Sequence, residues 1–221
     1  MKEFLLTDSD FKEVAHLVYN ACGIVLGEHK REMVYSRLAR RIRERKLTNF
    51  SSYLDYLKNH KDQEFDAFIN AITTNLTSFF REMHHFEFIK DQLIPTLLKT
   101  NKQTKRIRIW SAGCSTGEEP YSLAMTLQGA FPSDWDVKIL ATDLDSNVLA
   151  KAQSGIYTAA NVNGLDDALL KRWFLTSKDG QSYKVKPKLQ QCISFKRLNL
   201  LQDWPMKGPF DLILCRNVVI Y

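Results

Sequence analysis

The strongest constraint on the fold is a change in the pattern of apolar residues near residue 100. Before it, apolar residues recur at helical spacing, whereas beyond it short apolar strands alternate with helical segments. Strands are expected at residues 107–110, 137–141 and 210–215, and the last is a continuous apolar run suited to burial on both faces. Strands that alternate with helices favour a parallel, doubly wound sheet. We therefore expect an all-α domain over residues 1–100 and an α/β domain over residues 101–221.

The first hundred residues predict four or more short amphipathic helices. Thr7 and Asp10 match a capping box, and Gly23 is a natural stop for the helix that follows. A second helix is expected over residues 30–46, a third is capped by Ser51 or Ser52, a fourth surrounds residues 65–72, and a fifth covers residues 83–98. Such helices form a small bundle.

Residues 155–197 are less regular. Gly180 lies in a polar turn between two apolar segments at residues 173–175 and 183–185, a pattern that predicts a β-hairpin. We expect a small β insertion at about residues 157–195.

Several classes of protein are excluded by composition. No window approaches ~18 consecutive apolar residues, so no transmembrane helix and no direct membrane insertion are expected. The N-terminus turns polar at Thr7 and lacks the apolar core of a signal peptide. The four cysteines are widely spaced without a CxxC pair, which favours a cytoplasmic location. His84 and His85 are adjacent rather than four residues apart, so we expect no metal site.

The loop at residues 111–119 is rich in small residues, which allow a close approach of backbone to a ligand. It is neither G-x-G-x-x-G nor a Walker loop, and its end at Glu118 and Glu119 would repel phosphates. The loop suits a ligand with a positive centre or a free amine. The alternative is an ordinary turn whose acidic residues favour the N-terminus of the next helix.

Two further polar segments follow expected strands, at the ends where open α/β sheets bind ligands. Asp143 could accept hydrogen bonds from both ribose hydroxyls of a nucleoside, or it could, with Asp145, simply open the next helix. Arg216 and Asn217 would face the same cleft, or form a strand-end turn. Together, these loops suggest a nucleoside that carries no phosphate and bears an amino acid, as S-adenosylmethionine does.

One segment of the helical part, residues 73–81, is dense in Thr, Asn and Ser, which are mediocre helix formers. This segment either forms a loop between helices or contributes hydrogen-bonding side chains from the helical part to the ligand site.

Taken together, these segments resemble the CheR family of chemotaxis receptor methyltransferases. The resemblance covers residues 70–221, and the motifs run in the family's order: Thr73-Thr74-Asn75-x-Thr77-x-Phe79-Phe80-Arg81-Glu82, Trp110-Ser111-Ala112-Gly113-Cys114-Ser115-Thr116-Gly117-Glu118-Glu119-Pro120-Tyr121-Ser122, Ala141-Thr142-Asp143-Leu144-Asp145, Ser154-Gly155-Ile156-Tyr157, Asn199-Leu200 and Phe210-Asp211-x-x-x-Cys215-Arg216-Asn217-Val218-x-Ile220-Tyr221.

The resemblance implies a fold and an activity. The fold would be a Rossmann-like class I S-adenosylmethionine-dependent methyltransferase domain with a small β insertion, preceded by an all-α N-terminal domain. The enzyme would be a protein-glutamate O-methyltransferase that transfers a methyl group from S-adenosylmethionine to glutamate side chains of membrane chemoreceptors. Family members continue beyond the last motif, so the resemblance also implies an α/β domain that is incomplete at its C-terminus.

The resemblance also assigns residues by motif. The cofactor would be met by Asn75, Thr77 and Arg81 from the helical part, by Glu118 at its methionine or amine end, and by Asp143 at its ribose. Asn199 and Leu200 would lie by the adenine, and Arg216 and Asn217 would line the cleft. Arg81 and Tyr221 are the candidates for the methyl-transfer site.

The partners implied are the cytoplasmic helical bundles of methyl-accepting receptors, with recruitment of a monomeric enzyme to membrane receptor arrays. Residues 28–48 hold eight basic and three acidic side chains, which could steer docking to an acidic bundle or form a solvated face.

Three other functions have some support in the sequence. A nucleic-acid methyltransferase is suggested by the net charge of +6, but the excess is even along the chain: 17 basic against 14 acidic residues through Lys105, and 14 against 11 beyond it. No nucleic-acid partner is therefore expected. A non-catalytic binding module would not need the polar residues, and a dinucleotide oxidoreductase would need the missing phosphate fingerprint.

Overall fold

The computed structural model describes residues 2–218, and Tyr221, one of the two candidate catalytic residues, lies outside them. The described chain forms two compact units, one of residues 2–74 with 199–203 and one of residues 75–198 with 204–218. The boundary therefore differs from the expected one at residue 100. The reason is that Phe86, Ile89 and Leu97, on the helices after residue 83, belong to the same apolar core as Ile107 of the first strand.

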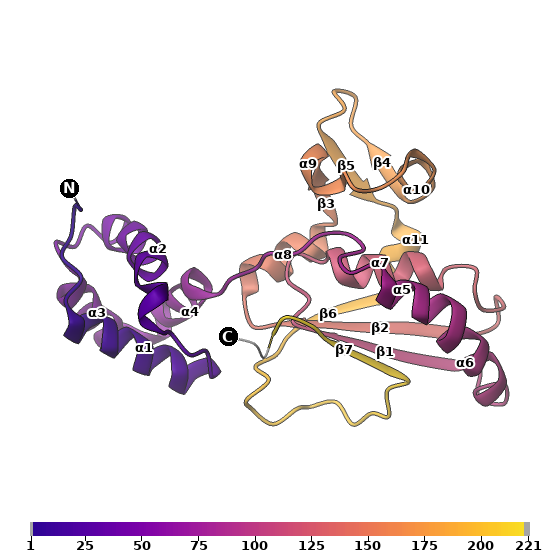
Figure 1. Ribbon diagram of the computed structural model, residues 1–221, viewed down its shortest axis with the longest axis horizontal. Helices are drawn as coiled ribbons and strands as arrows, with labels where there is room; N and C mark the ends of the chain where they lie inside the picture. The colour runs from indigo at the N-terminus through magenta and orange to yellow at the C-terminus, as the bar shows by residue number, and fades with distance from the viewer. Residues whose placement is uncertain (1, 219–221) are drawn as a thin grey trace. The chain divides into compact units, whose positions relative to one another are not determined.

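The helical unit contains α1 (Asp8–Cys22), η1 (Glu28–Lys30), α2 (Arg31–Glu44), α3 (Phe50–Asn59) and α4 (Lys61–Ile72), as Figure 1 shows. The capping box of Thr7 and Asp10 is confirmed, and so is the stop at Gly23, which adopts the left-handed conformation with φ 70°. The expected cap of α3 is wrong. Asn49 is the N-cap, and Ser52 is its reciprocal partner three residues on.

A buried charge cluster fixes α2 against α4. Glu64 is fully buried, and its carboxylate accepts hydrogen bonds from Arg41, Arg45 and the hydroxyl of Tyr53. Arg37 donates to the carbonyl oxygens of residues 72 and 73 at 2.6 and 2.7 Å, and thereby satisfies the C-terminal end of α4. Much of the basic charge on α2 is therefore engaged within the helical unit.

The α/β unit is built on a four-stranded sheet of β1 (Arg106–Ala112), β2 (Asp136–Asp143), β6 (Ile193–Arg197) and β7 (Leu212–Cys215). The strand order is β6-β2-β1-β7, and every pairing is parallel, which confirms the predicted fold class. The sequence did not predict β6. Its residues alternate weakly, and the strand is defined by its pairing with β2.

The helices of this unit are α5 (His84–Phe88), the π-helical η2 (Ile89–Leu93), α6 (Ile94–Thr100), α7 (Glu118–Leu127) and α8 (Ser146–Ser154). The single helix expected over residues 83–98 is therefore interrupted by a π turn. Asp145 caps α8: one carboxylate oxygen accepts from the amides of Asn147 and Val148. Within the described residues, no helix is both long and apolar enough to cross a membrane.

A second, antiparallel sheet stands apart from the first in Figure 1. It has the order β3-β5-β4, from β3 (Ile156–Thr158), β4 (Phe174–Thr176) and β5 (Ser182–Val185), with α9 (Ala159–Val162) and α10 (Asp167–Trp173) between β3 and β4 and α11 (Pro187–Gln190) after β5. The predicted hairpin is confirmed as β4 and β5, with Gly180 at φ 70° in its turn. The small sheet ends at Val185, whereas the expected insertion ran to residue 195 and included the start of β6.

Candidate functional site

The site lies at the carboxyl ends of the parallel strands. After β1 the chain adds β2 and β6 on one side, and it then returns to place β7 on the other side of β1. Ala112, Thr142 and Cys215 are in register at this edge. A reversal of strand order opens a crevice between the loops that leave the neighbouring strands, and ligands of open α/β sheets bind there.

The loop after β1 is folded tightly over the end of β2. The amides of Gly113 and Cys114 both donate to the carbonyl oxygen of Thr142 at 2.8 Å. Gly117 caps α7 with φ 97°, and a Cβ at this position would lie 2.8 Å from the Cβ of Ala152 and 2.9 Å from the hydroxyl of Tyr157. Glycine is therefore needed here both for the backbone conformation and for space.

Asp143 ends β2 and is joined to this loop. One carboxylate oxygen accepts from the amide of Ser115 at 2.8 Å, and the other accepts from the amide of Asp145 at 3.0 Å. Burial raises the pKa of Asp143, against these backbone hydrogen bonds, which lower it. Each carboxylate oxygen has a second lone pair, so the side chain has the capacity to accept from two further hydroxyls.

Glu118 is the first residue of α7 and is 1% exposed. Its carboxylate accepts from the hydroxyl of Thr116 at 2.6 Å, and the backbone oxygen of Thr116 accepts from Tyr157 at 2.8 Å. Burial raises the pKa of Glu118. Because desolvation disfavours its charge, a cationic group beside it would favour the ionised form.

The segment before Arg81 reaches the same loops. Asn75 donates to the second carboxylate oxygen of Asp145 at 2.8 Å, and its backbone oxygen accepts from the hydroxyl of Ser115 at 2.9 Å. Thr77 is half-buried in this segment. These bonds attach residues 75–77 to the loops that follow β1 and β2.

Arg216, directly after β7, is held among three partners. Its guanidinium donates to Glu119 at 3.1 Å and to the backbone oxygen of Arg81 at 2.5 Å, and it lies 3.2 Å from Glu82. Glu119 also accepts from the hydroxyl of Ser111 at 2.7 Å. The side chain of Arg216 is only 11% exposed.

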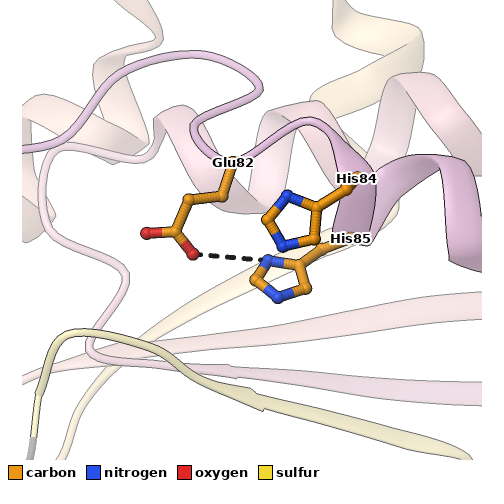
Figure 2. A group of neighbouring side chains, drawn as sticks. All are labelled: Glu82, His84 and His85. Carbon is orange, nitrogen blue, oxygen red and sulfur yellow. Dashed lines mark ion pairs between the residues drawn. The ribbon is translucent and has the colours of Figure 1, made fainter.

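Figure 2 shows Glu82, His84 and His85 side by side. Their possible ligand atoms all lie within 4.8 Å of one another, and Nδ1 of His85 is 3.5 Å from Glu82. The Glu82 carboxylate, however, is already flanked by the guanidinium groups of Arg81, at 3.9 Å, and Arg216. A metal ion would enter between two positive charges, so we assign this cluster to ion pairing.

The structure brings most predicted site residues together in the α/β unit, but not all of them. Those gathered at the strand ends or in the segment before α5 are Asn75, Thr77, Arg81, Glu118, Asp143, Arg216 and Asn217. Asn199 and Leu200 belong instead to the helical unit, where Asn199 donates to the backbone oxygen of Ala21 at 2.7 Å. Their predicted place beside an adenine stays a prediction.

Sequence reasoning gave no role to several residues that build the site. These are Glu82, Ser115, Ser122 and Tyr157. A buried hydroxyl on α7, such as that of Ser122, could have been suspected from its place among apolar neighbours. The others are linked to partners far along the chain, which no local pattern shows.

The residues present fit S-adenosylmethionine in charge and in hydrogen-bonding capacity. Two carboxylates, the buried Glu118 and the half-buried Asp143, lie at the ends of the loop and strand that would hold an amino-acid group and a ribose. A ligand with an ammonium and a sulfonium is cationic at both centres, so it complements these carboxylates, whereas a pyrophosphate would be repelled.

Comparison with known proteins agrees with this chemistry. Residues 75–221 match the model of the CheR methyltransferase SAM-binding domain, and residues 9–73 match the model of the CheR methyltransferase all-alpha domain. These two matches cover nearly the whole chain, and they meet where the two compact units divide near residue 74.

Similar proteins from several bacteria bear one description. A chemotaxis protein methyltransferase of Escherichia coli is 44% identical over 98% of this chain and 75% of its own length. Chemotaxis protein methyltransferase 2 of Pseudomonas aeruginosa is 43% identical over 100% of this chain and 78% of its own length. A chemotaxis protein methyltransferase of Borreliella burgdorferi is 38% identical over 98% of this chain and 78% of its own length.

Proposed function

The chain belongs to the CheR methyltransferase family, and on this premise we propose that it methylates glutamate side chains of chemotaxis receptors, forming glutamyl methyl esters. It is an S-adenosylmethionine-dependent methyltransferase. The observation that carries the proposal is a pair of carboxylates, the buried Glu118 at the start of α7 and the half-buried Asp143 at the end of β2. They supply charge and acceptors where the cofactor's amine and ribose need them.

The acceptor needs little chemical activation. When bound, S-adenosylmethionine supplies an electrophilic methyl group on a good leaving group. A glutamate side chain, with a pKa of about 4.3, is already a carboxylate at neutral pH, so no general base is required. The residues of the protein therefore act by aligning the acceptor oxygen and by excluding water.

Arg81 is the proposed orienting group for the incoming carboxylate. Its guanidinium is about one-third exposed, and one nitrogen donates to the backbone oxygen of Leu76 at 2.9 Å. The remaining donors are available for a charge-assisted hydrogen bond to the acceptor. An ion pair that is too tight would lower the nucleophilicity of the oxygen, so positioning rather than strong binding is its role. Tyr221 is proposed as the second residue of this site.

The proposed cofactor contacts divide by chemistry. Glu118 holds the amine end and Asp143 the ribose, while Asn75 and Thr77 approach from the segment before Arg81. Arg216 and Asn217 line the cleft after β7. Asn199 and Leu200 are proposed to lie by the adenine, on the strength of the family motif alone.

The receptor is proposed to dock, at membrane receptor arrays, onto the part of α2 whose charge remains exposed. Arg40 is 79% exposed and Arg43 is 55% exposed, and each pairs with a carboxylate that is itself partly exposed. Exposed pairs of this kind exchange partners at little cost. An acidic helical bundle could therefore engage these two guanidinium groups. We also propose that the enzyme acts as a monomer.

The test is methyl transfer from S-adenosylmethionine labelled in its methyl group. We expect label to enter receptor-containing membranes and not transfer RNA or duplex DNA. Arg81→Ala should lower turnover by about a hundredfold or more, because a charged orienting group of this kind contributes ~3 kcal/mol. Thermal melting serves as the folding control. Near-normal transfer by Arg81→Ala would refute its role, and label in nucleic acid alone would refute the proposed substrate.

A further inference from the structure

We propose that Arg216 is a positioning residue: together with Glu82 and Glu119 it clamps the turn that carries Arg81. This inference rests on the proposed function for the role of Arg81, and on the structure alone for the clamp itself. It assigns to Arg216 a task beyond lining the cleft. Glu82 and Glu119 have no proposed contact with the cofactor.

The clamp joins three separate segments of the α/β unit. Arg216 comes from the loop after β7, Glu119 from the first turn of α7, and Glu82 from the turn before α5. One terminal nitrogen of Arg216 reaches Glu119, and the other reaches both Glu82 and the backbone oxygen of Arg81. The backbone of Arg81 is therefore tied directly to the edge of the sheet.

The turn itself needs such a restraint. Phe80 and Glu82, on either side of Arg81, both adopt positive φ angles, of 50° and 58°. This conformation is unfavourable for residues other than glycine and persists only where the surroundings impose it. Two contacts besides the clamp impose it here. The amide of Phe80 donates to the hydroxyl of Ser122 at 2.9 Å, and its ring packs edge-on against Phe86 at 5.1 Å.

The geometry suits arginine and not lysine. A planar guanidinium presents two terminal nitrogens that can serve two carboxylates and a carbonyl oxygen at once, whereas an ammonium is a single point charge. Arg216 lies between the two carboxylates of Glu82 and Glu119. Lysine at this position would keep the charge but would reach fewer of the three acceptors, so the turn would loosen without a large change in the electrostatic field.

The first measurement needs no substrate. Hydrogen exchange of the amides at residues 78–83 reports the opening of the turn. We expect Arg216→Lys and Glu82→Gln to accelerate exchange in this segment by about tenfold or more, with the melting temperature nearly unchanged. Arg106→Lys, an exposed arginine at the far end of β1, is the control and should leave exchange there as it is. Unchanged protection in both variants would overturn the clamp, whatever the enzyme methylates.

The second measurement asks whether Arg216 acts through Arg81. Arg216→Lys should lower kcat by about tenfold while the dissociation constant of S-adenosylmethionine shifts less than about threefold. In an Arg81→Ala background the same change should cost almost nothing further, because residues that act as a unit are not additive. A tenfold loss of cofactor affinity at unchanged kcat, or a full additive loss in the double variant, would show a direct cofactor contact instead.

Discussion

Glu118 is the single residue on which the polarity of the site depends most. A carboxylate buried to 1% exposure has little reason to remain charged unless a cationic group is brought beside it. Asp143 is only half-buried, and its two oxygens also organise the loop backbone. Glu118 is therefore the cleaner position at which to test the cofactor, since a change there removes charge and leaves most of the loop intact.

Glu118→Gln should weaken the binding of S-adenosylmethionine by about ten- to a hundredfold. The reason is that a buried charge-assisted hydrogen bond contributes ~1.5–3 kcal/mol. Titration calorimetry measures the change. Adenosine, which lacks the amino-acid group, is the matched control ligand and should bind the variant and the parent equally. An unchanged dissociation constant for S-adenosylmethionine would remove Glu118 from the site.

The pH dependence of binding gives an independent check on this residue. Burial raises the pKa of Glu118 above its usual value of 4.5 in the free protein, and an ammonium group favours the ionised form. Affinity should therefore rise with pH above 4.5, as the raised pKa is passed. Glu118→Gln should lack this contribution.

At the scale of single elements, α2 carries two kinds of arginine. Arg41 reaches the fully buried Glu64, whereas Arg40 is paired with Glu44 and is 79% exposed. The two arginines are adjacent in sequence, so they form a natural matched pair. They differ in burial and in that Arg41 reaches Glu64.

Arg41→Ala should destabilise the protein by ~2 kcal/mol, and Arg40→Ala by less than ~0.5 kcal/mol. Breaking a buried ion pair is costly because it leaves a charge without its partner, although Arg45 remains on Glu64 and reduces the loss. An exposed pair within one helix contributes little. Urea unfolding of both variants measures the difference. Equal losses would mean that the Glu64 cluster contributes no more than the surface pair.

Sequence reasoning succeeded with elements whose signal is local. The capping box at Thr7 and the hairpin around Gly180 are fixed by neighbours within a few residues, and both were predicted. The π turn at residues 89–93 and strand β6 were not, because each is selected by packing and pairing with distant segments. The cap of α3 was misplaced by two or three residues since Asn49 and Ser52 are both good capping types.

At the scale of the whole molecule, the same distinction holds for the site. The places of Glu118 and Asp143, after β1 and at the end of β2, could be predicted because sequence patterning can locate the ends of parallel strands. Their contacts with the cofactor stay predictions. The clamp on Arg216 could not be predicted, since its partners lie 97 and 134 positions earlier in the sequence. The domain boundary was misplaced for a related reason. The amphipathic pattern after residue 83 indicates that these helices bury one face, but it does not indicate whether that face packs in the helical unit or in the α/β unit.

Receptor docking is also a property of the whole molecule. Reversing Arg40 and Arg43 to Glu should slow receptor methylation at low salt by about tenfold or more, and the loss should shrink as salt screens the charges. Reversing Arg106 and Lys188, two exposed cations of the α/β unit, changes the net charge equally and is the control. If both double variants respond alike, net charge rather than a docking surface governs the rate.

The base lability of the product tests whether this enzyme makes a methyl ester on a receptor glutamate. Receptor-containing membranes are incubated with the enzyme and methyl-labelled S-adenosylmethionine, and the isolated receptor is then treated with mild alkali. We expect the label to be released as volatile methanol, because carboxylate esters hydrolyse under these conditions. Label that stays on the receptor after alkali, as an N-methyl group would, rules out an ester product.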